Sequence, residues 1–166
     1  FIKNFAKKQT IGIEPCSNVE KITKQKKFNT YPEYWSKKLS KKILNKNGKV
    51  DVIYSANTIS HIKDLNEVFN AINLILKPNG VLIIEDPSLI ECLKRNTYDQ
   101  FYNEHIYVFS TLALENILKK YGLKIFRIEK LKIHGGSNRY FIKKKEGKKK
   151  YKNQLIYIKK RKSNLE

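Results

Sequence analysis

Leu76-Lys77-Pro78-Asn79-Gly80-Val81-Leu82-Ile83-Ile84-Glu85-Asp86-Pro87 is the stretch of sequence that decides the fold. Its first proline and its glycine end any helix that runs into it, because proline has no backbone N–H and glycine destabilises a helix. The four residues that follow the glycine are all apolar, which is typical of a parallel strand covered on both faces. Two carboxylates and a second proline then end the strand. The stretch therefore predicts a buried strand whose carboxyl end is acidic.

Strand-like and helix-like segments alternate on both sides of this stretch. The other predicted strands are Thr10–Pro15, Phe28–Tyr31, Val50–Asn57, Leu123–Ile133 and Asn138–Lys144. The predicted helices are Ser17–Lys27, Glu33–Asn45, Asp64–Leu76 and Thr111–Tyr121. Ser17 or Asn18 is expected to cap the first helix, and Asp64 with Glu67 resembles a capping box on the third. Repeated β-α units predict an α/β fold with a parallel sheet and helices on both faces, and the last two strands predict a terminal antiparallel hairpin.

Polar side chains stand where three of the predicted strands end: Glu14, Asn57 and the pair Glu85-Asp86. In parallel sheets, ligands bind outside the carboxyl ends of the strands. A carboxylate at such an end is a natural acceptor for a pair of ribose hydroxyls. The alternative for Glu14 is that a polar residue simply marks the end of a strand, and both interpretations remain open at this point.

The segment Tyr98–Ser110 concentrates acid-base chemistry, with Tyr102, Glu104 and His105 within four residues. Histidine can give and take protons near neutral pH. A carboxylate beside it can orient it, and a phenol can donate a hydrogen bond to a developing oxyanion. The alternative is that the aromatic residues pack in the core and the acid-base pair is a solvated loop corner. Because the segment follows a predicted strand end, its position favours a site.

The net charge of +20 invites a nucleic-acid interpretation. Only four of the basic residues are arginine, the usual bidentate reader of phosphates and guanine, and the lysines are spread along the chain. Because Lys, Ile, Asn and Tyr all have A/T-rich codons, genome composition explains the excess without a polyanion partner. The Lys-rich tail from Lys143 to Lys162 keeps a nucleic-acid-binding module as an alternative.

The two cysteines, Cys16 and Cys92, have neither zinc-ligand spacing nor a disulfide framework, and no metal site is predicted. Cysteine usage of this kind fits a reducing, cytoplasmic setting. No apolar run approaches the ~20 residues needed to span a bilayer, so no membrane segment is predicted.

Several segments occur in an order that resembles one enzyme family. They are Ile11-Gly12-Ile13-Glu14-Pro15, Asp51-Val52-Ile53 with Asn57, His61-Ile62-Lys63-Asp64-Leu65, Leu76-Lys77-Pro78-Asn79-Gly80-Val81, Tyr102-Asn103-Glu104-His105, and His134-Gly135-Gly136-Ser137 with Arg139. Together they resemble the class I S-adenosylmethionine-dependent C-methyltransferases that act on nucleotide-linked deoxysugars, over nearly the whole chain to about Lys145. Leu-Lys-Pro-Asn-Gly is general to methyltransferases, whereas Tyr-x-Glu-His followed by His-Gly-Gly-Ser is more specific.

The resemblance implies a Rossmann-like methyltransferase sheet and roles for particular residues. His105 would be the general base that forms an enolate of a keto-sugar nucleotide, beside Tyr102 and Glu104. Glu14, followed by Pro15, would hold the ribose of S-adenosylmethionine, and Asn57 would lie near its methionine part. The residues implied for the sugar-nucleotide pocket are His61, His134, Ser137 and Arg139. From the residues alone, His61 can equally be a helix-entry residue bonded to backbone, and His134 can equally cap its turn. The family normally has His where this chain has Asn103, which leaves the proposed chemistry intact.

The resemblance also implies parts that this sequence lacks. These enzymes carry a cysteine-rich zinc module, a central first strand and an acidic glycine-rich loop that cradles the cofactor. We therefore expect residues 1–145 to be a partial methyltransferase domain, residues 146–166 to be the Lys-rich start of a further region, zinc to belong only to the missing module, and the chain alone to be inactive.

The remaining alternatives are a methyltransferase for another small-molecule acceptor and an inactive relative. The oligomeric state is left open.

Overall fold

The computed structural model describes residues 6–147 of the chain. Its strands are β1 (Ile11–Ile13), β2 (Asn29–Tyr31), β3 (Val50–Ala56), β4 (Leu76–Pro87), β5 (Leu123–Leu131) and β6 (Ser137–Lys144). Its α-helices are α1 (Ser17–Gln25), α2 (Lys37–Asn47), α3 (Leu65–Ile75), α4 (Leu89–Arg95) and α5 (Thr111–Lys119), and its 3-10 helices are η2 (Lys7–Gln9), η3 (Ile59–His61) and η4 (Tyr98–Gln100). The α/β class is as predicted.

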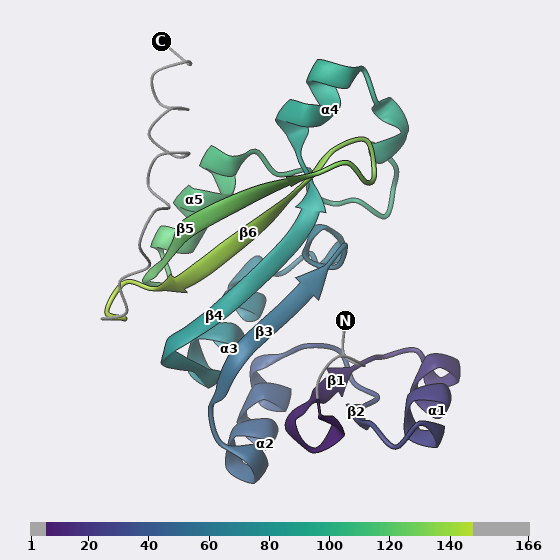
Figure 1. Cartoon of the computed structure of the whole chain (residues 1–166), viewed down its shortest axis with the longest axis vertical. Helices are drawn as coiled ribbons and strands as arrows, with labels where there is room; N and C mark the ends of the chain where they lie inside the picture. The colour runs from purple at the N-terminus through teal and green to yellow at the C-terminus, as the bar shows by residue number, and fades with distance from the viewer. Residues whose placement is uncertain (1–5, 148–166) are drawn as a thin grey trace.

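Four strands form the main sheet in the order β3-β4-β6-β5 (Figure 1). β3 runs parallel to β4, and β6 runs antiparallel to both β4 and β5. The predicted terminal hairpin is therefore confirmed. It brings the strands that follow in sequence back against β4, so that Glu85 pairs with Arg139 and Asp86 with Asn138.

The decisive stretch forms β4, which starts directly after α3. The predicted turn forms an irregularity within β4. Val50 of β3 pairs with Leu76 before it, and Val52 pairs with Val81 after it. Gly80 makes this irregularity possible, since a Cβ on it would lie 2.7 Å from Leu76 Cδ1 and 3.0 Å from the Asp51 carbonyl. The prediction of an acidic end is confirmed, because the strand runs to Pro87.

β1 and β2 form a separate parallel pair. Within residues 6–147 β1 and β3 do not pair, which agrees with the expectation that the sheet lacks its central first strand. The two sheets share a hydrophobic layer instead. Ile11 of β1 and Ile53 of β3 both pack on a buried cluster made of Tyr31, Leu39, Ile43 and Ile75.

α3 and α5 cover one face of the main sheet with a common core. Phe69 from α3 and Leu114 from α5 are fully buried against Ile84 of β4 and Ile142 of β6. Phe141 lies next to Ile142 and faces the other side, where it contacts Phe126 and the Arg127 guanidinium. The core therefore fixes which residues of β4 and β6 face α3 and α5.

Several helix boundaries differ from the predictions for local reasons. Cys16, rather than Ser17 or Asn18, occupies the N-cap of α1; it makes no side-chain capping bond, and its backbone N–H donates to Glu14. α2 begins at Lys37 instead of at residue 33, since Ser36 accepts from the backbone N–H of Leu39. α4 was not predicted. Its seven residues are too few to show a helical period.

The capping prediction for α3 is half confirmed. Asp64 accepts from the backbone N–H of Glu67, but the Glu67 carboxylate accepts from the backbone N–H of Lys37 and so ties α3 to α2. Within residues 6–147, none of the helices combines the length and the apolar character that a bilayer crossing requires.

Candidate active site

The candidate site lies at the carboxyl ends of β3 and β4. Asn57 follows β3, and its backbone N–H donates to the Glu85 carbonyl at 2.7 Å, so the two strand ends stay paired to their last residues. Asn57 has a φ of +48°, in the left-handed region that asparagine tolerates better than most residues. This turn lets the chain leave β3 and enter η3.

His134, from the turn between β5 and β6, reaches Asn57. The Asn57 side-chain nitrogen lies 3.3 Å from His134 Nε2. Because an amide nitrogen only donates, Nε2 is the acceptor. The structure therefore brings together Asn57, which was predicted for the cofactor site, and His134, which was predicted for the sugar-nucleotide pocket.

The turn that carries His134 is held closely against α4 and η4. Gly135 has a φ of +67°, and a Cβ on it would lie 2.7 Å from Thr97 Oγ1. Gly136 has a φ of +112°, and a Cβ there would lie 2.7 Å from Glu91 Cβ. The Gly136 carbonyl also accepts from the backbone N–H of Ser88. The two glycines are required by conformation and by space, which fixes the position of His134.

A short hydrogen-bond chain orders the segment between α4 and α5. His105 Nδ1 lies 2.7 Å from the Gln100 backbone carbonyl, and Nε2 lies 2.9 Å from the Tyr102 hydroxyl. The Tyr102 and His105 rings are 4.1 Å apart between centroids. Tyr102 is 46% exposed, so this chain begins at the surface and ends at a backbone carbonyl.

His61, on η3, joins this group. Its ring centroid lies 4.7 Å from that of His105 and 6.5 Å from that of Tyr102. η3 is tied to the same segment by the backbone N–H of Tyr107, which donates to the Ser60 carbonyl at 3.1 Å. Residues from two separate motifs, His61 from one and Tyr102 with His105 from the other, thus form one cluster.

Asp86, which the sequence analysis placed at an acidic strand end, lies buried against η3. It is 1% exposed and accepts from the Ser60 hydroxyl at 2.8 Å. Burial raises the pKa of the Asp86 carboxyl to about 6, against hydrogen bonds from Ser60 and the charge of His105, which lower it. The position of Asp86 after an apolar strand was a signal, but its burial and its bond to Ser60 depend on η3, which no sequence pattern predicted.

Other predicted residues make different contacts. The Glu104 side chain is exposed, and in the described part of the chain no hydrogen bond or ion pair joins it to His105. Ser137 is fully buried and donates to the Ile133 carbonyl. Arg139 binds the carboxylates of Glu85 and Glu129 across three strands, and these bonds raise the pKa of the Arg139 guanidinium.

The predicted cofactor residues lie on both sheets. Glu14 follows β1, is partly exposed, and uses Oε1 to accept from the Cys16 backbone N–H at 2.9 Å, beside an exposed Pro15. Asn57 follows β3 in the other sheet. The carboxylate fits a ribose in chemistry, since it can accept further hydroxyl protons beyond its bond to Cys16.

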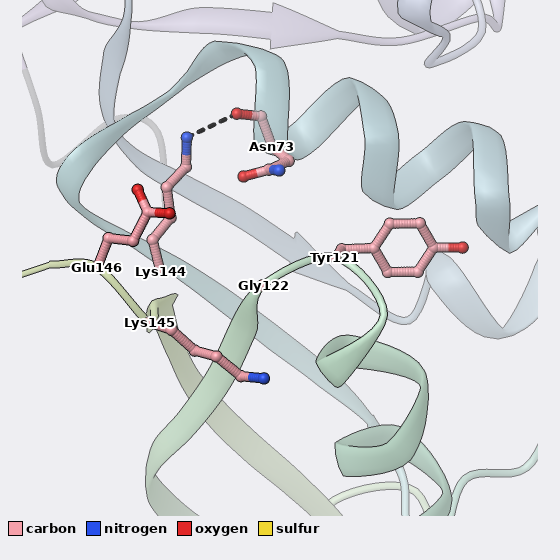
Figure 2. Close-up of a pocket in the computed structure, with 6 residues that line it drawn as sticks. All are labelled: Asn73, Tyr121, Gly122, Lys144, Lys145 and Glu146. Atoms are coloured by element: carbon pink, nitrogen blue, oxygen red, sulfur yellow. Dashed lines mark hydrogen bonds between the residues drawn. The ribbon is translucent and has the colours of Figure 1, made fainter.

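A separate pocket of about 240 Å³ lies where β5 begins and β6 ends, at the opposite end of the main sheet from Asn57. Figure 2 shows this pocket in close-up. It is lined by Asn73, Tyr121, Gly122, Lys144, Lys145 and Glu146. Lys144 Nζ donates to the Asn73 carbonyl at 2.7 Å, and burial lowers the pKa of the Lys144 ammonium. Because it lies near the start of β4, this pocket is not part of the cluster around His105.

Two sequence-based expectations are limited by the described range. Most of the Lys143–Lys162 tail, and with it the predicted region 146–166, falls outside residues 6–147. Within that range no group of three His, Cys, Asp or Glu side chains could hold a metal ion.

Comparison with known proteins gives a consistent result. The family model described as a methyltransferase domain matches residues 1–128. The C-methyltransferase NovU of Streptomyces niveus is 28% identical over 129 residues, which are 78% of this chain and 31% of NovU. The chain thus spans less than a third of that relative's length.

Two solved structures share the fold. A methyltransferase from Anabaena variabilis described as SAM-dependent superimposes with a TM-score of 0.64 at 12% identity, over 87% of this chain and 71% of its own. An S-adenosylmethionine-dependent methyltransferase from Clostridium acetobutylicum gives 0.57 at 16% identity, over 82% of this chain and 75% of its own. At these identities the likeness concerns the fold alone.

Proposed function

The chain belongs to the methyltransferase domain family, and from that premise we propose that it serves S-adenosylmethionine-dependent methyl transfer to a carbon of a keto-sugar nucleotide or a similar small molecule. The observation that carries the proposal is the hydrogen-bond chain from Tyr102 through His105 to the Gln100 carbonyl. It lies near the carboxyl ends of the strands, where α/β sheets bind ligands. The name of the relative NovU, a C-methyltransferase, also supports carbon as the acceptor.

The two bonds of His105 define its tautomer. A backbone carbonyl only accepts hydrogen bonds, so Nδ1 carries the proton that is donated to Gln100. In the neutral ring Nε2 then has a free lone pair, and the Tyr102 hydroxyl donates to it. His105 therefore presents its basic nitrogen toward the half-exposed phenol, on the side from which a substrate would arrive.

This arrangement suits proton abstraction from a carbon acid. A carbon next to a carbonyl becomes nucleophilic when it loses a proton and its electron pair spreads onto the carbonyl oxygen as an enolate. His105 Nε2 takes that proton, while Nδ1–H stays bonded to Gln100. The Tyr102 hydroxyl, released from Nε2, can donate to the enolate oxygen. Positioned proton transfer of this kind contributes ~10²–10⁴-fold to the rate.

The cofactor would be held by residues on both sheets. When bound, S-adenosylmethionine supplies an electrophilic methyl group on a sulfonium. Glu14 and the adjacent Pro15 would bind its ribose, and Asn57 would bind its methionine part. His134 orients the Asn57 side chain. We further propose that His61 lines the acceptor site, because its ring lies against that of His105.

The proposal is tested by separating enolate formation from methyl transfer. A nucleoside-diphosphate keto-sugar is incubated with the protein in D₂O, and deuterium at the carbon next to the carbonyl is followed by NMR. We expect exchange with the parent protein and a loss of ~10²-fold or more in His105→Asn, since the base is gone. Lys145→Ala, at the opposite end of the sheet, is the control and keeps the parent rate.

Methyl transfer is then measured with labelled S-adenosylmethionine and the same keto-sugar, in a protein that joins this chain to the central strand and glycine-rich loop that the family resemblance implies, because the chain alone is expected to be inactive. The expected product carries the label on carbon. Label on oxygen or nitrogen, or equal exchange in the parent protein and His105→Asn, would contradict the proposal.

A further inference from the structure

Glu91 is a buried carboxylate on α4 that the proposed chemistry does not use. It is 5% exposed. Burying a carboxylate is costly unless the charge is paired and hydrogen-bonded. Here Nζ of Lys130 lies 2.6 Å from Glu91 Oε1, and Nε of Arg95 lies 3.8 Å from Oε2. Arg95 is one turn further along α4, whereas Lys130 belongs to β5, so the Lys130 bond joins the helix to the sheet.

The bond to Lys130 keeps Glu91 charged. It lowers the pKa of the Glu91 carboxyl, against burial, which raises it. The 2.6 Å distance to Lys130 is that of a direct hydrogen bond between two ions, whereas Arg95 lies beyond hydrogen-bonding distance. Glu91 is therefore an anion at neutral pH, and its main partner comes from the sheet.

Glu91 also packs directly against the turn that carries His134. A Cβ on Gly136 would lie 2.7 Å from Glu91 Cβ and 3.5 Å from Glu91 Cγ, so no side chain fits between the turn and the glutamate. β5 ends one residue after Lys130 and leads into this turn. The same carboxylate thus contacts the turn at one end and holds the strand that enters it at the other.

α4 contacts this turn at two further points, and both are neutral. At its start, the backbone N–H of Ser88 donates to the Gly136 carbonyl at 3.0 Å. Beyond its end, Thr97 Oγ1 lies 3.4 Å from the Gly135 carbonyl, which is a long hydrogen bond. A charge-assisted hydrogen bond is roughly twice as strong as a neutral one. We therefore expect the turn to loosen most when the charge of Glu91 is removed.

The position of the turn decides whether His134 reaches Asn57. The Asn57 amide nitrogen lies 3.3 Å from His134 Nε2. At about 3.6 Å the contact would no longer be a hydrogen bond. A displacement of a few tenths of an ångström is therefore enough to release the Asn57 side chain.

We propose that Glu91 positions this turn, so that His134 stays within hydrogen-bond reach of Asn57. It does so by binding Lys130 at the end of β5 and by packing against Gly136. The inference rests on the proposed function only for the use of Asn57 in binding the cofactor, because the contact between Asn57 and His134 exists without cofactor. Glu91 touches no reacting atom and is a positioning residue.

The test follows the Asn57 side-chain amide by NMR in the full 166-residue chain. In the parent chain His134→Asn is expected to shift this signal, because asparagine tolerates the left-handed backbone but is too short to reach Asn57. In Glu91→Gln, which keeps the shape of the side chain and removes its charge, we expect this response to be lost. An equal response to His134→Asn in the parent chain and in Glu91→Gln would overturn the proposal.

Glu20→Gln is the matched control. Glu20 is 6% exposed and pairs with Lys24 four positions further along α1, just as Glu91 pairs with Arg95. Figure 1 shows α1 beside β1 and β2, well away from α4. Glu20→Gln therefore removes a buried helical carboxylate without touching the turn, and the Asn57 response should be kept. Its loss in Glu20→Gln as well would mean general loosening and would contradict a positioning role for Glu91.

Changes at Lys130 keep the test decisive if Glu91→Gln does not fold. The Lys130 side chain is 43% exposed, so Lys130→Met removes the cation without burying a new group. We expect the Asn57 response to be lost in Lys130→Met and recovered in Lys130→Arg, which restores the positive charge. An unchanged response in Lys130→Met would also overturn the proposal.

None of these measurements needs cofactor or substrate. If the Asn57 response depends on Glu91 but the methyl label is found on oxygen or nitrogen, the positioning role stands and the proposed function alone is refuted.

Discussion

The side-chain nitrogen of Asn57 lies 3.3 Å from Nε2 of His134, although 77 positions separate the two residues. Both have a left-handed backbone, with φ of +48° and +49°. Asn57 directly follows β3, and His134 lies in the turn between β5, which ends at Leu131, and β6, which begins at Ser137. Two strained turns therefore meet at one point, and backbone strain of this kind persists where the surrounding structure enforces it.

Gly135 and Gly122 offer a matched test of how the His134 turn is held. Their φ angles are +67° and +65°, but a Cβ on Gly135 would meet Thr97 Oγ1 at 2.7 Å, whereas a Cβ on Gly122 would meet nothing within 4 Å. Gly122→Ala is expected to cost about 1 kcal/mol of unfolding free energy for the left-handed backbone alone. Gly135→Ala should cost at least about 1 kcal/mol more, because Thr97 must move.

Urea unfolding of the two alanine variants measures both costs. Equal losses of unfolding free energy in Gly135→Ala and Gly122→Ala would mean that Thr97 moves aside at no cost and that it does not fix the position of His134. A larger cost in Gly135→Ala should be accompanied by a shift in the NMR signals of His134.

The Asp86 carboxyl predicts an unusual pH dependence of stability. Its pKa is raised in the folded chain from 3.8 to about 6. The folded state therefore holds this proton more tightly than the unfolded state. The contribution of the proton to stability is complete below about pH 4 and is lost as the pH rises through 6. Asp86→Asn, which stays neutral, should therefore stabilise the fold by about 2 kcal/mol at pH 7 and by far less at pH 4.

The measurement is urea unfolding of the parent chain and Asp86→Asn at the two pH values. Asp99→Asn, an exposed change in the same region, should show no such difference between pH 4 and pH 7. A destabilised Asp86→Asn at pH 7 would mean that the carboxylate is held by contacts stronger than its bond to Ser60.

Arg139 is expected to contribute to stability through its ion pairs. Arg139→Met leaves the buried Glu85 without its cation and should cost about 2 kcal/mol, less than a fully buried pair because 35% of the Arg139 side chain is exposed. Arg127→Met is the matched control, since Arg127 is exposed, pairs with Glu129 and packs on the Phe141 ring, which methionine can also cover. Its loss should cost at most about 0.5 kcal/mol. A double-mutant cycle with Glu85→Gln isolates the pair, and zero coupling would contradict this role.

The strands and the segment that carries His105 could be predicted from hydrophobic periodicity and from the polar residues at strand ends. The apolar run of β4 and the alternation of β5 gave the right strands, and the clustering of chemistry between residues 102 and 105 located the segment that the structure brings next to His61. Two features could not be predicted from the sequence. The Gln100 contact uses a backbone carbonyl, which every residue has. The burial of Asp86 depends on η3, which no sequence pattern predicted. The break between the two sheets, by contrast, agrees with the expected absence of a central strand.

Cofactor binding by this chain alone is predicted to be weak. Glu14 ends β1 and Asn57 ends β3, and no strand pairing joins the sheets to which they belong in residues 6–147. The two sheets are held together by apolar packing on the cluster around Leu39 and Ile43. Since hydrogen bonds do not fix the distance between the two ligand-binding ends, part of the binding energy is spent on ordering them.

Isothermal titration calorimetry of the 166-residue chain with S-adenosylmethionine should therefore show a Kd in the millimolar range, about 4 kcal/mol of binding free energy. Glu14→Gln is the matched variant, because it keeps the size and hydrogen-bonding atoms of the side chain and removes the charge. If Glu14 accepts ribose hydroxyls, even weak binding should fall further in this variant, as seen in the cofactor-induced shifts of NMR signals near β1. Micromolar binding by the parent chain would contradict this prediction. It would show that apolar packing alone positions β1 and β3 for the cofactor, without strand hydrogen bonds between the two sheets.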